Sequence, residues 1–209
     1  MDGAETIAGV VLAGGQSSRM GGGDKCLQPL GGKPLLAHVL ARLSPQVSQL
    51  AINANGNPSR FDVFGLPVVA DNSCDFQGPL AGIEAGLRWA TNRCPNTAWA
   101  VTVAGDTPFI PSDLVARLLQ AVREAPMAVA TSGEGLHPVV GIWPVTMAQA
   151  LADNLASGKR KATDWVKSQG AAEVFFDAVE IGGTQVDPFF NINRPDDLRA
   201  AEALLKRES

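Results

Sequence analysis

The strongest constraint on the fold is an alternation of strand-like and helix-like segments along the whole 209-residue chain. The strand-like segments are short apolar runs, and the helix-like segments repeat apolar residues at helical spacing. The strand-like segments cover residues 8–14, 49–55, 66–71, 97–106, 127–131, 137–144 and 172–176. The helix-like segments cover residues 33–45, 78–90, 111–124, 147–157 and 194–207. This order predicts a three-layer α/β fold with a mostly parallel central sheet and helices on both faces.

The segment "TAWAVTVAGD" (97–106) is apolar at nearly every position. Strands with this pattern have both faces covered by helices, so this segment is expected at the centre of the sheet. No internal repeat, low-complexity tract or linker interrupts the chain. We therefore expect one domain over residues 1–209.

The charge balance limits the partners of the chain. Its 17 basic and 21 acidic residues give a net charge of −4, which disfavours broad binding to nucleic acid or to an anionic membrane. No apolar run approaches the roughly 18 residues of a membrane span, and "MDGAETIAG" does not resemble a signal peptide. The expected location is the cytoplasm.

Cysteine usage agrees with that location. Cys26, Cys74 and Cys94 form no CxxC or Cys/His metal pattern, and an odd number suits a reducing compartment. All three are interpreted as structural or incidental.

Several polar or glycine residues directly follow predicted parallel strands. Ligands of such sheets bind at the carboxyl ends of the strands. These residues are Gly14, Gly15, Asn53, Asp71 and Asp106. They are expected along one edge of the sheet.

The loop "LAGGQSSRMGGGDK" (12–25) combines five glycines with Arg19 and Lys25. Glycines allow close backbone approach and leave N–H groups free for phosphate oxygens, and the two cations supply charge. The loop matches neither GxGxxG nor the P-loop GxxxxGK[ST]. It predicts a polyphosphate site, and a surface turn with scattered charges is the alternative.

Asp106 ends the buried strand, and a carboxylate there requires a cation, a donor or water. Mg²⁺ prefers carboxylates together with substrate phosphates, so Asp106 is a candidate magnesium ligand. Asn53 and Asp71 could bind a base or ribose in the same pocket. A turn-forming or capping role is the alternative for all three.

Together these segments resemble the molybdenum cofactor guanylyltransferases of the nucleotidyltransferase group, which share a Rossmann-like α/β fold. The loop resembles their LAGGxSxRMGxxDK signature. Five more segments occur in the family's order and at about its spacings, so the resemblance covers nearly the whole chain: "INAN", "DNSCDFQGPLAGI", "AGDTPFIP", "HPVVGIW" and "FFNINRPDDL".

The resemblance implies transfer of GMP from GTP to the terminal phosphate of Mo-molybdopterin, giving molybdopterin guanine dinucleotide and pyrophosphate. It implies the following roles: Leu12, Ala13, Gly14 and Gly15 hold the nucleotide, Lys25 the phosphates, Asn53 and Asp71 the guanosine, and Asp106 the Mg²⁺. Asn193 matches a position that helps to bind metal in relatives. Arg194 replaces the threonine of the common NxNTP form, which leaves its local contact open.

The chemistry fits these residue types. Two anionic substrates must meet while charge builds on the departing pyrophosphate, and Arg19, Lys25 and magnesium on Asp106 would neutralise that charge. Positioning the two substrates could supply up to roughly 7 to 11 kcal/mol of the reduction in the activation barrier. No protein nucleophile is required.

The roles of several other polar residues are left open by the sequence. Lys159, Arg160 and Lys161 form either a solvated helix end or a guide for the pterin phosphate. Asn191 is a further candidate for the pterin. His137 is interpreted as a packed histidine rather than an acid or base.

Two other functions stay in view. One is a transferase with another nucleotide or acceptor, such as a cytidylyltransferase, whose loop resembles LAAG, or a sugar-phosphate enzyme, whose loop resembles LAAGxGTR. The other is a non-catalytic nucleotide-binding module. We further expect a monomer that makes transient contacts with molybdoenzymes or cofactor chaperones.

Overall fold

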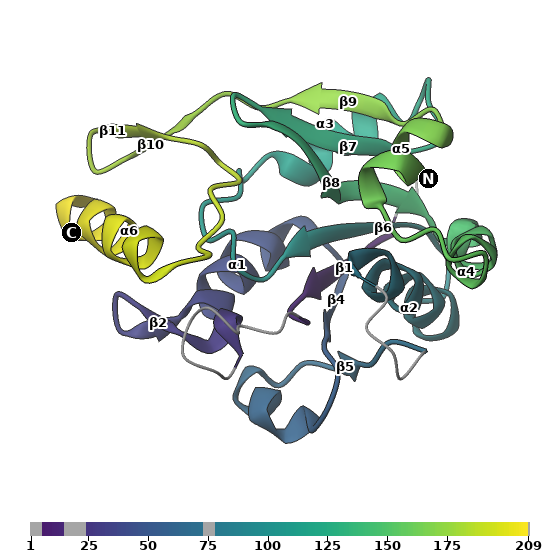
Figure 1. Cartoon of the computed structure of the whole chain (residues 1–209), viewed down its shortest axis with the longest axis horizontal. Coiled ribbons are helices and arrows are strands. Elements are labelled where there is room, and N and C mark those ends of the chain that lie inside the picture. Colours follow the sequence, from purple (N-terminus) through teal and green to yellow (C-terminus); the bar gives the residue numbers. More distant parts are fainter. Residues whose placement is uncertain (1–5, 15–23, 73–77, 209) are drawn as a thin grey trace.

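The computed structural model describes residues 6–14, 24–72 and 78–208. Its main feature is a seven-stranded sheet in the order β5-β4-β1-β6-β8-β7-β9 (Figure 1). The strands are β1 (Thr6–Leu12), β4 (Gln49–Asn53), β5 (Val68–Val69), β6 (Thr97–Ala104), β7 (Ala128–Ser132), β8 (Gly135–Pro144) and β9 (Ala172–Phe175). The predicted mostly parallel sheet is therefore confirmed, with β8 running antiparallel to both of its neighbours.

Helices cover both faces of the sheet, as the alternation predicts. They are α1 (Leu35–Leu43), α2 (Pro79–Arg93), α3 (Leu114–Ala121), α4 (Ala148–Ala156), α5 (Ala162–Ser168) and α6 (Pro195–Glu208). The described residues also form short 3₁₀ helices: η1 (Lys25–Leu27), η2 (Ser44–Gln46), η3 (Pro58–Phe64) and η4 (Val145–Met147).

Alternate residues of the central strands enter two separate cores. In β1, Ile7 and Val11 pack with α1 and α3, whereas Ala8 packs with α2, α4 and α5. Strand β6 divides in the same way, with Val101 in the first core and Ala100 in the second. Burial on both faces explains why the segment 97–106 has so few polar residues.

A third, smaller core lies at the end of the molecule where the chain finishes (Figure 1). Two hairpins reach it, β2 (Pro29–Leu30) with β3 (Lys33–Pro34), and β10 (Val179–Ile181) with β11 (Thr184–Val186). Helix α6 packs on β10 and β2. The hairpin β10–β11 and helix α5 are absent from the sequence-based prediction, because each is short and carries little periodic signal.

Among the described residues, no helix is both long and apolar enough to cross a membrane.

Candidate active site

The carboxyl ends of four parallel strands form the edge that carries the predicted site. Leu12 at the end of β1 is in register with Asn53 on β4 and with Ala104 on β6. The backbone continues this pairing, since Ala13 N–H donates to the Asn53 carbonyl at 2.8 Å and Gly105 N–H donates to the Leu12 carbonyl at 2.9 Å. Leu12, Ala13 and Gly14 line a hollow of about 50 Å³ together with Lys25, Cys26, Gly105 and Asp106. Gly15 and Arg19 lie outside the described residues.

Lys25 is the centre of a polar cluster drawn from three parts of the chain. Its ammonium group forms an ion pair with the Asp106 carboxylate and donates to the side-chain oxygens of Asn193 and, at 3.1 Å, Asn191. The Asp106 carbonyl accepts a hydrogen bond of 3.0 Å from Ile192 N–H, which fixes the segment between the two asparagines against β6. The structure thus brings together two candidate phosphate and metal residues that are 81 positions apart.

The oxygen atoms around Lys25 suit a hard divalent cation. One carboxylate and two amide oxygens converge on a single positive charge, and Mg²⁺ uses such ligands while keeping waters and substrate phosphates. Within residues 6–14, 24–72 and 78–208, no group of three or more His, Cys, Asp or Glu side chains could hold a metal. A metal here would therefore depend on Asp106, the amides and the substrate together.

The second part of the edge is a hydrogen-bonded set on β4 and β5. The Asn53 side chain, 4% exposed, donates to Asp71 Oδ1 at 2.9 Å and to the Val69 carbonyl at 3.0 Å. Asn55 donates to Asp71 Oδ2 at 2.8 Å and accepts from Asp71 N–H at 2.8 Å. Both predicted nucleoside residues are thus held in one orientation. Asn55 was not among the predicted site residues, although its spacing of two from Asn53 within "INAN" is a usable signal.

Asp24 connects the glycine-rich loop to this polar set. Its carboxylate contacts the guanidinium of Arg60 on η3, with both side chains about one quarter exposed or less. Arg60 also donates to the carbonyls of Asn55 and Asn57. The partner of Asp24 is thus an arginine far from it in the sequence.

A buried carboxylate on α2 supports the segment that follows Asp71. Glu84 is 3% exposed, contacts Arg88 Nε and accepts from Asn72 Nδ2 at 2.7 Å. The partners satisfy the charge that burial would otherwise penalise. Glu84 therefore holds the residue directly after a predicted nucleoside ligand.

The basic run 159–161 lies apart, between α4 and α5. All three side chains are exposed, and Lys161 pairs with Asp164 at 3.1 Å. They line a separate hollow with Trp165. The described geometry is that of a solvated helix end, and a role with the pterin phosphate stays a hypothesis. Arg194 is exposed, and its N–H donates to Asp197 at the start of α6.

The cysteines that the structure describes, Cys26 and Cys94, are buried free thiols. Burial, reinforced by the charges of Asp24 and Asp106, raises the pKa of Cys26 to about 12. A thiol that stays protonated is a poor nucleophile, so Cys26 acts as packing behind Lys25.

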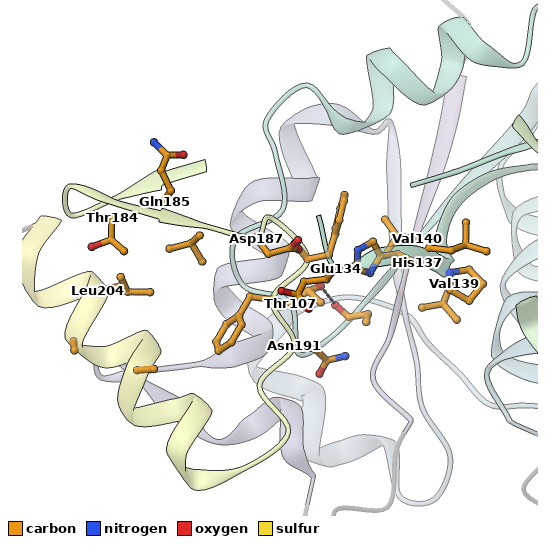
Figure 2. Close-up of a pocket in the computed structure, with 18 of the residues that line it drawn as sticks. Thr107, Glu134, His137, Val139, Val140, Thr184, Gln185, Asp187, Asn191 and Leu204 are labelled. Carbon is orange, nitrogen blue, oxygen red and sulfur yellow. Dashed lines mark hydrogen bonds between the residues drawn. The ribbon is translucent and has the colours of Figure 1, made fainter. Parts of the chain in front are cut away.

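A larger cavity of about 940 Å³ (Figure 2) shares Asn191 with the Lys25 cluster. Thr107 and Asn191 are at its inner end, and His137 lies in its wall. His137 Nε2 lies 2.7 Å from Ser132 Oγ, and burial lowers the pKa of this imidazole. The packed environment predicted for His137 is found, although one side of the ring borders the cavity.

Comparison with known proteins places this geometry in a family. Residues 9–174 match the family described as the MobA-like NTP transferase domain. The molybdenum cofactor guanylyltransferase of Mesorhizobium japonicum is 51% identical over 203 residues, which is 96% of each chain. The chain belongs to the molybdenum cofactor guanylyltransferase family. The molybdenum cofactor guanylyltransferase of Nitrobacter hamburgensis is 47% identical, and the match covers 94% of this chain and 93% of the relative.

Solved structures agree on the fold of this family member. Molybdopterin-guanine dinucleotide biosynthesis protein A from Archaeoglobus fulgidus gives a TM-score of 0.73 at 22% identity, covering 96% of this chain and 99% of that one. A Mycobacterium tuberculosis protein solved in complex with manganese gives 0.67 at 21% identity, covering 96% and 100%. These structures show the Rossmann-like α/β fold, and the family match shows that the chain is a nucleotidyltransferase enzyme.

Proposed function

We propose that this family member transfers GMP from GTP to the terminal phosphate of Mo-molybdopterin, with Mg²⁺ as the metal. An acceptor phosphate oxygen forms a bond to the α-phosphorus of GTP, the bond to the β-phosphate oxygen breaks, and pyrophosphate leaves. The observation that supports this most directly is the cluster of Lys25, Asp106 and Asn193 at the sheet edge, beside Gly14. Family membership supplies the substrates.

The chain's own residues position the reacting groups. The backbone of residues 12–15 would hold the nucleotide, and Lys25 with Arg19 would hold its phosphates. Asp106, with the amide oxygen of Asn193, would bind Mg²⁺, which when bound neutralises phosphate charge. Preorganised charges of this kind contribute to catalysis because they need no reorganisation during the reaction.

Nucleoside choice would rest on Asn53 and Asp71. Each Asp71 oxygen already accepts one amide hydrogen bond, and carboxylate oxygens have further lone pairs for donors of the substrate. Since Asn53 and Asn55 fix this carboxylate, the donors of a guanine or ribose would meet a preformed acceptor.

The test is a nucleotide-specificity assay that follows pyrophosphate release with the pterin acceptor. We expect turnover with GTP, magnesium and molybdopterin together, and little with CTP. Asp106→Ala should lower kcat by roughly 100- to 1000-fold, the usual cost of losing one transition-state group. Asp106→Asn keeps the shape of the side chain and should show a similar loss, and Asp177→Ala, at an exposed carboxylate, is the control.

Equal use of CTP would instead support a cytidylyltransferase. Nucleotide binding without turnover would support a non-catalytic module. Normal turnover by both Asp106 variants would refute the assignment of the metal site.

Two wider expectations belong to this proposal. Because the product is a labile cofactor, we propose transient contacts with molybdoenzymes or with cofactor-binding chaperones. We also propose that the enzyme acts as a monomer in the cytoplasm, where GTP is available. Crosslinking during product release and sedimentation of the free enzyme test these points.

A further inference from the structure

The large cavity opens directly onto the proposed reaction centre. Its inner end contains Thr107, which follows Asp106, and Asn191, whose Oδ1 lies 3.1 Å from Lys25 Nζ. From there it extends between β8, the segment after β11, and α6 (Figure 2). The nucleoside residues Asn53 and Asp71 lie on β4 and β5, on the other side of β1 in the sheet order. A molecule in this cavity would therefore approach Lys25 from the side opposite to the nucleoside.

The walls of the cavity suit a flat ring system. Its volume of about 940 Å³ is in the range of small-molecule sites. Val139, Phe190 and Leu204 contribute apolar surface. The rings of His137 and Phe189 lie 4.6 Å apart and add aromatic surface. Aromatic and aliphatic walls of this kind stabilise the burial of a heterocycle.

The wall of the cavity carries two carboxylates, and Arg207 on α6 lines its far part beside Thr184. Glu134 and Asp187 line the cavity beside His137 (Figure 2). Asp187 Oδ1 accepts a 2.8 Å hydrogen bond from Phe189 N–H, which fixes the carboxylate. Next to Asn191, the ammonium of Lys25 supplies positive charge. The cavity thus complements a molecule that carries hydrogen-bond donors on its ring and an anionic group that reaches Lys25.

We propose that this cavity binds the ring system of the acceptor, with the N–H donors of a fused amino-heterocycle on Glu134 and Asp187 and the terminal phosphate directed to Lys25. This inference rests on the proposed function, because molybdopterin is such a molecule. Carboxylates are strong acceptors for amino and ring N–H groups, since charge-assisted hydrogen bonds are about twice as strong as neutral ones. Glu134 and Asp187 are therefore specificity-determining residues for the acceptor.

The variants that test this keep the shape of each side chain. Asp187→Asn retains an oxygen for Phe189 N–H, and Glu134→Gln is isosteric. The matched control is Glu180→Gln, an exposed glutamate on β10 that does not line the cavity. Steady-state KM values for molybdopterin and for GTP are measured for each protein, together with its melting temperature.

We expect the Glu134→Gln/Asp187→Asn double variant to raise the KM for molybdopterin about tenfold or more, the loss of about one charge-assisted hydrogen bond. The KM for GTP and the melting temperature should stay close to those of the wild type and of Glu180→Gln. A KM for molybdopterin that stays unchanged in the double variant overturns the inference. An equal rise in both KM values also overturns it, because it would indicate a general structural effect.

A binding experiment separates this inference from the proposed function. The probe is 6-hydroxymethylpterin, a fluorescent ring without a phosphate, titrated into the enzyme without GTP. Wild-type enzyme should bind it, and the double variant should bind it about tenfold more weakly. If wild type fails to turn over molybdopterin but shows this difference, the proposed function fails and the site stands. If both proteins bind the probe equally or not at all, the site is wrong.

Discussion

Replacing Gly82 by alanine is expected to damage nucleotide binding more than folding. A Cβ at Gly82 on α2 would lie 3.0 Å from Asn53 Cγ and 3.2 Å from Leu12 Cδ2, and closer still to Asn53 Oδ1. Because Asn53 is almost fully buried and held by two hydrogen bonds, it cannot turn aside without losing its contact with Asp71. The added methyl group would therefore disrupt the fixed orientation of both residues.

The size of each effect follows from these contacts. Overpacking costs about 1 to 3 kcal/mol, and alanine regains about 1 kcal/mol of helix propensity, so the net loss of stability should be about 0 to 2 kcal/mol. Losing hydrogen bonds to the nucleoside that involve a carboxylate should cost about 2 kcal/mol, which corresponds to a roughly thirtyfold higher KM for GTP.

Gly86→Ala provides the matched control one helical turn away. Its Cβ would lie 2.9 Å from both Cγ atoms of Val10, in the core and away from Asn53. The assay combines chemical denaturation with the KM for GTP and for the acceptor. Gly86→Ala should lose stability and keep its KM for GTP. A Gly82→Ala enzyme with a wild-type KM for GTP would refute the reasoning.

Two further predictions concern residues around the loop 12–25. Asp24→Asn and Arg60→Met should each raise the KM for GTP severalfold, because each breaks the contact between these two side chains. The KM of the double variant should be no higher than that of the more impaired single variant. Additive effects in the double-mutant cycle, with no coupling of about 1 kcal/mol, would contradict this. For Cys26, burial raises the pKa from 9.0 to about 12, so the unfolded thiol ionises first and the free energy of unfolding should fall as pH rises from 9 towards 12. The free energy of unfolding, measured by denaturation at each pH, should therefore fall with pH more steeply for wild type than for Cys26→Ala. The slopes should differ by up to one proton, or about 1.4 kcal/mol per pH unit, and equal slopes would show that the thiol does not contribute.

The sequence was sufficient to predict the mostly parallel sheet and the edge at which its polar strand-end residues meet. Strands such as 97–106 can be recognised in the sequence because two covered faces require apolar residues throughout. Polar residues that follow parallel strands must lie at the same edge of the sheet. Gly14, Asn53, Asp71 and Asp106 accordingly lie together. Their chemical roles stay predictions, as do those of Gly15 and Arg19, which lie outside the described residues.

The contacts that the sequence could not predict depend on tertiary structure. Arg60 shows no local pattern that points to Asp24, since the two meet only when η3 folds back towards η1. The reversed direction of β8 is equally invisible, because apolar strands of either direction look alike in a covered sheet. The cavity of about 940 Å³ is formed by β8, the segment after β11 and α6, and no single sequence motif spans these segments.

The hydrogen bond from Ile192 to the Asp106 carbonyl has a consequence for biosynthesis of the chain. Ile192 belongs to the small core that joins α6 and the β10–β11 hairpin to Leu30 and Leu35 from the beginning of the chain. Because the chain is synthesised from its amino terminus, this segment emerges after every strand of the seven-stranded sheet. The sheet can form before the two asparagines beside Ile192 emerge, but Lys25 and Asp106 then lack both amides. The polar cluster around Lys25 is thus completed only when residues 191–193 close on the amino-terminal half of the sheet.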